Sequence, residues 1–302
     1  MSETMRDRFS SVATDLLLRD KKAVVVLAAI GASSFTDAPK TVRNRIIDVG
    51  IREQAMIGVA GGLALEGFRP IVMSYTPFLV ERPFEQIKLS LTHQGVHATL
   101  VSIGGSWDAS TEGRTHQAPE DVAVMSTLPG WTIHVPGTSD EAEQALRLAH
   151  ESSTSHYIRL SGDQNAASVD VRPGAISILR RGSDHGPTVL AVGPISDAVL
   201  EAVERTDATV LYTNVPRPID ADGLRAEVVG SEIVVVEPYL VGTSVAQVAA
   251  ALSDRPMRIK AIGVTDPELS HYGTPRELRA VHGLDTDGIR TALEHGIAQV
   301  AS

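Results

Sequence analysis

Short runs of β-branched and other apolar residues alternate with longer stretches of helical periodicity along most of the chain. This alternation is typical of α/β proteins, in which buried strands form a mainly parallel sheet and helices cover its faces. The sequence therefore predicts an α/β fold built on a parallel sheet. In the first half, the expected strands are residues 23–27, 71–73, 98–103, 131–135 and 156–160, and the expected helices are 53–65, 83–93, 119–127 and 139–150.

A break in this pattern divides the chain. Between residues 161 and 174, Gly, Asp, Asn, Ser and Pro gather without periodicity, as in a loop between domains. The chain has 302 residues, enough for about two domains of roughly 150 residues each. We expect one domain over residues 1–170 and a smaller α/β domain over residues 171–302. In the second domain, the expected strands are 188–192, 209–212, 232–236 and 258–262, and the expected helices lie near 196–205, 242–252 and 286–295.

Composition and charge exclude several classes of protein. The formal net charge is −10 and no basic run interrupts the acidic balance, so binding to nucleic-acid phosphates is not expected. The chain has no cysteine, which removes disulfides, thiolate metal ligands and cysteine nucleophiles. Its longest apolar run, residues 23–32, is well short of the ~20 residues of a membrane-spanning helix, and its charged start is unlike a signal peptide. We expect a soluble cytoplasmic protein.

Glu53 opens an expected helix that is almost wholly apolar and that contains Gly58, Gly61 and Gly62. Each glycine costs roughly 0.8–1 kcal/mol relative to alanine, so another segment must approach this helix closely. One interpretation is tight packing within the chain, with Glu53 as a first-turn acid that the helix dipole favours. The other is that the helix is buried on all sides. Burial would then raise the pKa of the Glu53 carboxyl group and allow it to share a proton with a ligand.

Several short motifs occur in an order that resembles the transketolases and their relatives. They are residues 50–56, 61–64, 84–88, 115–117, 129–136, 157–159 and 234–237, and the resemblance as a whole covers about residues 10–295. The resemblance implies a domain that binds the pyrimidine ring of thiamine diphosphate, followed by a transketolase-type C-terminal domain.

Glu53 falls on the glutamate that activates the cofactor in this family. The resemblance implies that its protonated carboxyl group hydrogen-bonds the pyrimidine ring nitrogen and stabilises the imino tautomer, so that the exocyclic nitrogen can take a proton from the thiazolium carbon. Residues 74–84 lie where the family places aromatic side chains that stack on the pyrimidine. Phe78 is the first choice for this role and Tyr75 the second. The alternative is that Phe78 and Phe84 are core residues.

His116 falls where transketolase-like enzymes place a histidine over the reacting carbonyl group. There an imidazole can donate a hydrogen bond to a developing alkoxide and shuttle protons. Glu112, four residues earlier, matches an acid that often contacts a hydroxyl of the donor sugar. Without the resemblance, a single loop histidine would be interpreted as solvated or structural.

Arginines are the candidates for binding a substrate phosphate. Arg159 ends an expected strand, at the edge where parallel sheets bind ligands, and it matches a family arginine that often contacts phosphate. The alternative for Arg159 is an ordinary surface ion pair. Arg82 is a second anion-binding candidate and Arg114 a third.

No metal site is expected in this chain. His93 and His97 are four residues apart, but Gly95 interrupts the helix that would place both on one face, and His271 receives no role. Thiamine enzymes hold the diphosphate through a divalent metal bound by a Gly-Asp-Gly…Asn motif, which residues 162–165 do not match. The resemblance therefore implies the C-terminal subunit of a split transketolase. An N-terminal subunit would bind Mg²⁺ or Ca²⁺ and the diphosphate, and two copies of each chain would form a heterotetramer.

The expected reaction is transfer of a two-carbon ketol unit from a ketose to an aldehyde. Two departures from the family pattern argue against a sugar-phosphate substrate. Gly104 lies where many transketolases have a phosphate-contacting histidine, and the chain lacks an acid that relatives frequently carry just after the strand 23–27. The alternatives are the β subunit of a 2-oxo acid dehydrogenase, a deoxyxylulose-phosphate-synthase-like activity and a non-catalytic assembly subunit. A plain nucleotide-binding module has little support, because no Gly-x-Gly-x-x-Gly loop follows a strand.

Overall fold

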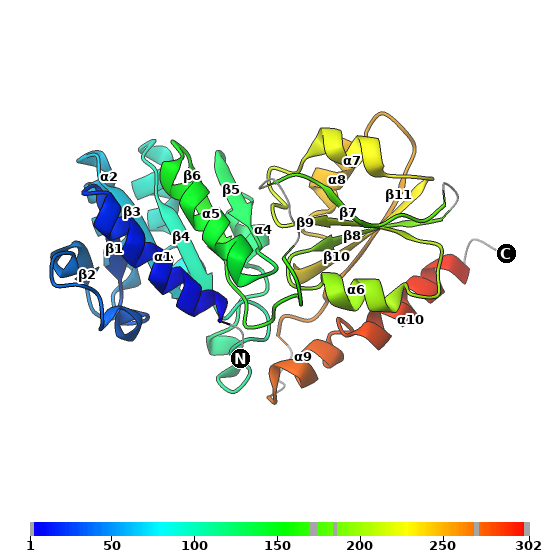
Figure 1. The fold of residues 1–302 in the computed structure, drawn as a ribbon, viewed down its shortest axis with the longest axis horizontal. Coiled ribbons are helices and arrows are strands. Elements are labelled where there is room, and N and C mark those ends of the chain that lie inside the picture. The colour runs from blue at the N-terminus through cyan, green and yellow to red at the C-terminus, as the bar shows by residue number, and fades with distance from the viewer. Residues whose placement is uncertain (1–2, 169–173, 184–185, 269–271, 299–302) are drawn as a thin grey trace.

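The computed structural model describes residues 3–168, 174–183, 186–268 and 272–298 of the chain. Two β-sheets lie side by side, and helices pack on the faces of each (Figure 1). The predicted α/β class is confirmed, because parallel strand pairs dominate both sheets.

The first sheet has six strands in the order β2-β1-β3-β4-β6-β5, and all its neighbouring strands are parallel. The carboxyl ends of β2, β3 and β4 therefore lie along one edge of the sheet, which is the edge that binds ligands in parallel sheets. The strands are β1 (Ala23–Leu27), β2 (Ile46–Asp48), β3 (Arg69–Tyr75), β4 (Thr99–Ile103), β5 (Trp131–His134) and β6 (Ser155–Arg159).

The second sheet has five strands in the order β11-β10-β8-β9-β7. Its edge strand β7 pairs with β9 in the antiparallel direction, while the other pairs are parallel. The strands are β7 (Ser177–Arg180), β8 (Thr188–Val192), β9 (Thr209–Thr213), β10 (Glu232–Leu240) and β11 (Arg258–Val264).

Helices α1 and α5 cover one face of the first sheet, and α2 packs in the core on its other face (Figure 1). The α-helices are α1 (Met5–Arg19), α2 (Glu53–Leu65), α3 (Phe84–Gln86), α4 (Asp121–Met125), α5 (Ser139–Glu151), α6 (Ser196–Ala202), α7 (Ala221–Glu227), α8 (Val245–Ala251), α9 (Pro275–Val281) and α10 (Thr286–Ala298). Short 3₁₀ turns cover Ala32–Phe35, Arg43–Arg45 and Gly113–Thr115, and π-helical turns cover Pro77–Glu81 and Ile87–His93. In the described ranges, no helix has the length and apolar character needed to cross a bilayer.

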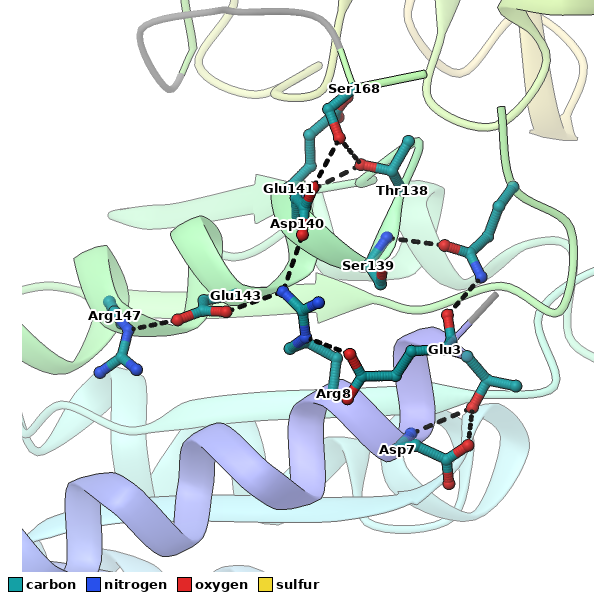
Figure 2. Close-up of polar contacts among 12 residues, drawn as sticks. Glu3, Asp7, Arg8, Thr138, Ser139, Asp140, Glu141, Glu143, Arg147 and Ser168 are labelled. Atoms are coloured by element: carbon teal, nitrogen blue, oxygen red, sulfur yellow. Dashed lines mark hydrogen bonds and ion pairs between the residues drawn. The ribbon is translucent and has the colours of Figure 1, made fainter. Parts of the chain in front are cut away.

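Polar contacts reinforce the packing of α1 on α5. Arg8 donates from Nη1 to Oδ1 of Asp140 at 2.7 Å and to Oε2 of Glu143 at 2.9 Å (Figure 2). Thr138 caps α5, because its hydroxyl oxygen accepts a hydrogen bond from the backbone N–H of Glu141. These contacts hold α1 against α5. The sequence predicted α5 but not α1.

The segment around Pro83 differs from the sequence prediction. Instead of one α-helix over residues 83–93, the chain forms the single turn α3 and then a π-helical stretch, and another π-helical turn begins at Pro77. Proline has no N–H group, so Pro77 and Pro83 interrupt regular α-helical hydrogen bonding. Isolated π-helical turns are frequent at functional sites, and this pair flanks Arg82.

The two sheets share a hydrophobic core. Trp131, Ile133 and Tyr157 from the first sheet belong to the same cluster as Leu190 and Leu211 from the second. Strand β6 of the first sheet ends at Arg159 and β7 of the second begins at Ser177. The predicted division between residues 170 and 171 falls between these strands, but residues 169–173 lie outside the described ranges, so the division stays a prediction.

Candidate functional site

Glu53 is a buried carboxylate at the first position of α2, just beyond the carboxyl end of β2. The chain reaches it through a sharp turn at Gly50, whose φ of 71° favours glycine. The side chain of Glu53 is 7% exposed, and Oε1 accepts a hydrogen bond from Nη1 of Arg82 at 3.0 Å. The Glu53 carboxyl group is therefore buried, as the second of the two interpretations of the sequence expects. It does not point into bulk water.

Three predicted ring side chains contact one another at the ends of β3 and β4. Tyr75 ends β3, Phe78 lies in the π-helical turn that follows, and His116 comes from the loop beyond β4. The ring centroid of His116 is 4.9 Å from that of Phe78 and 5.2 Å from that of Tyr75, and the two aromatic rings are 6.0 Å apart. We call Tyr75, Phe78 and His116 the ring cluster. It brings together candidates that are about forty residues apart in the sequence.

Arg82 connects the ring cluster to Glu53. The Cζ atom of its guanidinium group lies 3.9 Å from the ring centroid of Phe78, while Nη1 donates to the Glu53 carboxylate. The guanidinium group thus lies against an aromatic face and forms an ion pair at the same time. This pairing was not predicted from the sequence, in which Arg82 is a candidate only for binding substrate anions.

The loop that carries His116 is anchored by Arg114. Its guanidinium group donates to the backbone carbonyl of Gln117 at 2.9 Å, to Oε1 of Glu120 at 2.6 Å and to Oε1 of Glu268 at 3.0 Å. Glu268 follows β11 of the second sheet, so the second half of the chain helps to fix this loop. With both carboxylates and a carbonyl already bound, Arg114 acts as a loop anchor in this structure and is not an open anion site.

Glu112 lies at the start of the turn that leads to His116. Its carboxylate is exposed and accepts a hydrogen bond from the hydroxyl group of Thr111 at 2.8 Å. This hydrogen bond lowers the pKa of the Glu112 carboxyl group. The side chain belongs to the same loop as His116, but its carboxylate bonds to Thr111 and not to the ring cluster, so its substrate role stays a prediction.

Arg159 lies in a buried polar network. Its side chain is 2% exposed, Nε donates to Oδ2 of Asp121 at 2.8 Å, and Nη2 donates to the hydroxyl of Ser106 at 2.7 Å. Tyr157 donates to the same Asp121 oxygen at 2.5 Å. The ion pair considered as an alternative is present, although it is buried and not at the surface, and the phosphate-binding role of Arg159 stays a prediction.

The described ranges contain no group of three or more His, Cys, Asp or Glu side chains that could hold a metal ion. His93 ends a π-helical turn and His97 lies beyond a turn at Gly95, whose φ is 67°. The interruption that the sequence predicted at Gly95 is therefore present. His271 lies outside the described residues.

The glycines of α2 have two different surroundings. A Cβ atom at Gly61 would lie 2.6 Å from the backbone oxygen of Ser90, so close packing within the chain accounts for this glycine. At Gly58 and Gly62, a Cβ atom would meet nothing within 4 Å. The packing interpretation therefore explains only one of the three glycines, and the other two face outward.

Glu237 is a buried acid that received no role from the sequence, although it ends the motif at 234–237. The side chain lies in β10, and burial raises the pKa of its carboxyl group to about 7. Oε2 accepts a hydrogen bond from the backbone N–H of Ser244 at 3.0 Å, and Oε1 accepts one from Gly242. These bonds fix the turn that follows β10 and do not reach the ring cluster.

Comparisons with known proteins show which family and which chains this protein is similar to. Residues 2–165 match the family described as transketolase, pyrimidine binding domain. The chain is 44% identical over 289 residues to a protein of the fasciation locus of Rhodococcoides fascians, with 94% of this chain and 92% of that protein covered. It is 29% identical over 306 residues to an apulose-4-phosphate transketolase subunit of Phocaeicola vulgatus, with 96% of each covered.

Among solved structures, a split-gene transketolase described as an inactive beta4 tetramer has a TM-score of 0.84 at 26% identity, over 97% of this chain and 98% of that chain. Fold and site together define a transferase of the transketolase type. The chain belongs to the transketolase family, and its length matches that of subunits of the split form.

Proposed function

We propose that this chain is the C-terminal subunit of a split transketolase and that it supplies the pyrimidine-binding half of a thiamine diphosphate site. The observation that carries the proposal is the convergence of Glu53 and the ring cluster at the carboxyl edge of the first sheet. Thiamine diphosphate, when bound, supplies a carbanion centre that cleaves and forms bonds beside a carbonyl group. The reaction is transfer of a two-carbon ketol unit from a ketose to an aldehyde.

The residues beside Glu53 fit an aminopyrimidine ring. Oε1 of Glu53 and the face of Phe78 already hold one planar, nitrogen-rich group, the guanidinium of Arg82. An aminopyrimidine needs the same two contacts, a carboxyl group in its plane and an aromatic ring against its face. We assign Glu53 to hold the proton at the ring nitrogen and Phe78 to stack, with Tyr75 supporting Phe78 edge-on.

His116 is the proposed catalytic group toward the sugar. Its ring lies against Phe78, and its Nδ1 is 2.9 Å from the hydroxyl of Thr115, so Nε2 is the nitrogen left for substrate. From there it can donate a hydrogen bond to an oxygen on which negative charge develops. Glu112, on the same loop, is the proposed partner of a donor-sugar hydroxyl.

The outer face of α2 supports the presence of a second subunit. Gly58 and Gly62 are open, Leu65 at the end of α2 is 56% exposed, and Ile51, two residues before α2, is 77% exposed. A helix that is apolar on all sides is normally buried on all sides. We propose that an N-terminal subunit covers this face, brings Mg²⁺ or Ca²⁺ and the diphosphate-binding residues next to Glu53, and completes the site.

The proposed assembly is a heterotetramer with two copies of each chain. The similar split-gene transketolase is described as a beta4 tetramer, so chains of this kind associate with one another in that protein. We also propose that residues 171–302 form a transketolase-type C-terminal domain after a pyrimidine-binding domain over residues 1–170.

The proposal is tested by co-expressing the chain with its N-terminal-type subunit and assaying the purified complex. We expect thiamine-dependent transfer of a two-carbon unit from a ketose to an aldehyde, with no consumption of pyruvate. Glu53→Gln should form the same complex and lose at least about 100-fold in turnover, because it removes a proton-transfer group. Pyruvate consumption with release of carbon dioxide, and none of a ketose, would contradict the proposal and favour a 2-oxo acid dehydrogenase or a deoxyxylulose-phosphate-synthase-like enzyme.

A further inference from the structure

Arg82 makes, with its own guanidinium group, the two contacts that the proposed ligand ring requires. Nη1 lies 3.0 Å from Oε1 of Glu53, and Cζ lies 3.9 Å from the ring centroid of Phe78. We infer that Arg82 is a placeholder, which occupies the site of the aminopyrimidine in the free chain and must leave when thiamine diphosphate binds. This inference rests on the proposed function.

The two groups exclude each other on geometric grounds. A guanidinium and an aminopyrimidine are both flat and both present nitrogen atoms at their edge. Only one flat group can lie against this face of Phe78 while its edge reaches the Glu53 carboxyl group. Arg82 and the cofactor ring therefore compete for the same pair of side chains.

The burial of Glu53 explains why a placeholder is useful. A carboxylate that is 7% exposed and unpaired would destabilise the folded chain, because burial removes its hydration. The ion pair with Arg82 compensates this loss while the chain lacks cofactor and partner. It also keeps Phe78, which is 8% exposed, covered by an apolar and cationic surface.

The backbone of Arg82 is fixed while its side chain is free to leave. Its N–H donates to the carbonyl oxygen of Pro77 at 3.0 Å, and its carbonyl oxygen accepts from Nε2 of Gln54 at 3.2 Å. The side chain itself is 48% exposed. Rotation about the side-chain bonds therefore moves the guanidinium group into solvent without any change in the π-helical turn.

Cofactor affinity of the two-subunit complex tests the inference. Thiamine diphosphate is titrated into complexes that contain the wild-type chain, Arg82→Ala, Arg82→Gln or Arg69→Ala, with Mg²⁺ present. Arg69 is a matched control because it is an exposed arginine at the opposite, amino-terminal edge of β3. Removal of the competing guanidinium should tighten binding about tenfold and speed association in both Arg82 variants, whereas Arg69→Ala should bind like the wild type.

The other outcomes separate the inference from the proposed function. Unchanged or weaker binding by both Arg82 variants, with normal binding by the wild type, would overturn the placeholder and leave the proposed function intact. No binding by the wild-type complex would contradict the proposed function and the inference together.

Thermal unfolding of the isolated full chain provides a second readout. Arg82→Ala should lower the melting temperature, and the double variant Arg82→Ala with Glu53→Gln should recover most of the loss, because no buried charge is then left unpaired. Equal losses in the single and double variants would overturn the role of Arg82 as the partner of Glu53.

Discussion

The imidazole of His116 packs edge-on against the ring of Tyr75, with centroids 5.2 Å apart and ring planes at 81°. Tyr75 ends β3 and His116 lies in the loop beyond β4, so this contact joins the two neighbouring strand ends on which the proposed site is built. Gly104, directly after β4, makes the approach possible. Its φ is 74°, and a Cβ atom there would lie 2.6 Å from Cδ1 of Tyr75 and 2.9 Å from the carbonyl oxygen of His116.

Gly104→Ala should therefore strain the backbone, because of the positive φ, and also displace Tyr75 or His116. A matched control is Gly130→Ala, because Gly130 has a φ of 76° and a Cβ atom there would meet nothing within 4 Å. Urea unfolding should show a loss of about 1–2 kcal/mol for Gly130→Ala from the positive φ alone. Gly104→Ala should lose roughly 1–3 kcal/mol more because of overpacking against Tyr75. Equal losses in the two variants would contradict the close approach.

Arg159→Ala should destabilise the chain strongly, because it leaves Asp121 buried without its ion-pair partner. Loss of one partner of a buried ion pair costs about 3–5 kcal/mol, and replacing both Arg159 and Asp121 by leucine should recover part of this loss. Denaturant unfolding of the isolated chain measures both values. A variant as stable as the wild type, with a raised KM for a phosphorylated sugar, would instead support the phosphate-binding role expected from the sequence.

Arg114→Ala should lower turnover with little effect on cofactor affinity, because it releases the loop that carries His116 from Gln117, Glu120 and Glu268. A misplacement of about 1 Å can cost on the order of 100-fold in rate, and we expect a loss of about 10- to 100-fold in kcat. Glu268→Gln, which weakens one exposed contact, should have a much smaller effect. Steady-state kinetics of the complex measure kcat for both variants. Equal kcat values for Arg114→Ala and Glu268→Gln would contradict the role of Arg114 as a loop anchor.

A buried histidine pair should make a contribution to stability that is lost in mildly acidic solution. Nε2 of His134 lies 2.9 Å from Nδ1 of His156, and burial lowers the pKa of His134 to about 3 and that of His156 to about 4, from an ordinary value of 6.5. Between those values and 6.5, the unfolded chain binds protons that the folded chain does not. The contribution of the pair to the free energy of unfolding should therefore have its full value above about pH 7 and fall as the pH decreases toward 4, by up to about 1.4 kcal/mol per pH unit for each histidine.

Chemical denaturation at a series of pH values measures this dependence. His134→Gln should have a visibly shallower slope between pH 6.5 and about 4 than the wild type. The exposed His93 provides the control, since His93→Gln should leave the slope unchanged. A wild-type slope retained in full by His134→Gln would show that the buried pair does not cause the effect.

Much of the fold could be predicted because its signal is local. The run at 23–27 is buried at every position in β1, and the expected helix 53–65 is α2 with the same bounds. The antiparallel strand β7 was missed because it has four residues, none fully buried, so no apolar run marks it. The helix α1 was missed because its charged start obscures the apolar face formed by Phe9, Val12 and Leu16.

The candidate site could be predicted only in part. Glu53, Phe78 and His116 could be found as residue types in a known order, and the structure brings them together. The ion pair between Glu53 and Arg82 could not, because it joins residues 29 apart through a side-chain rotamer and a π-helical turn that leaves no periodic signal. The buried ion pair between Arg159 and Asp121 could not be predicted either. The strand pattern places Arg159 at the end of a strand but does not show which side chain it contacts.

Calorimetric titration of thiamine diphosphate with Mg²⁺ into this chain alone, into the N-terminal-type subunit alone and into the mixture tests the half-site most directly. We expect tight, stoichiometric binding only in the mixture, because Glu53 and Phe78 hold the ring and a second chain holds the charged diphosphate. Binding of the same affinity by the isolated chain would contradict the half-site.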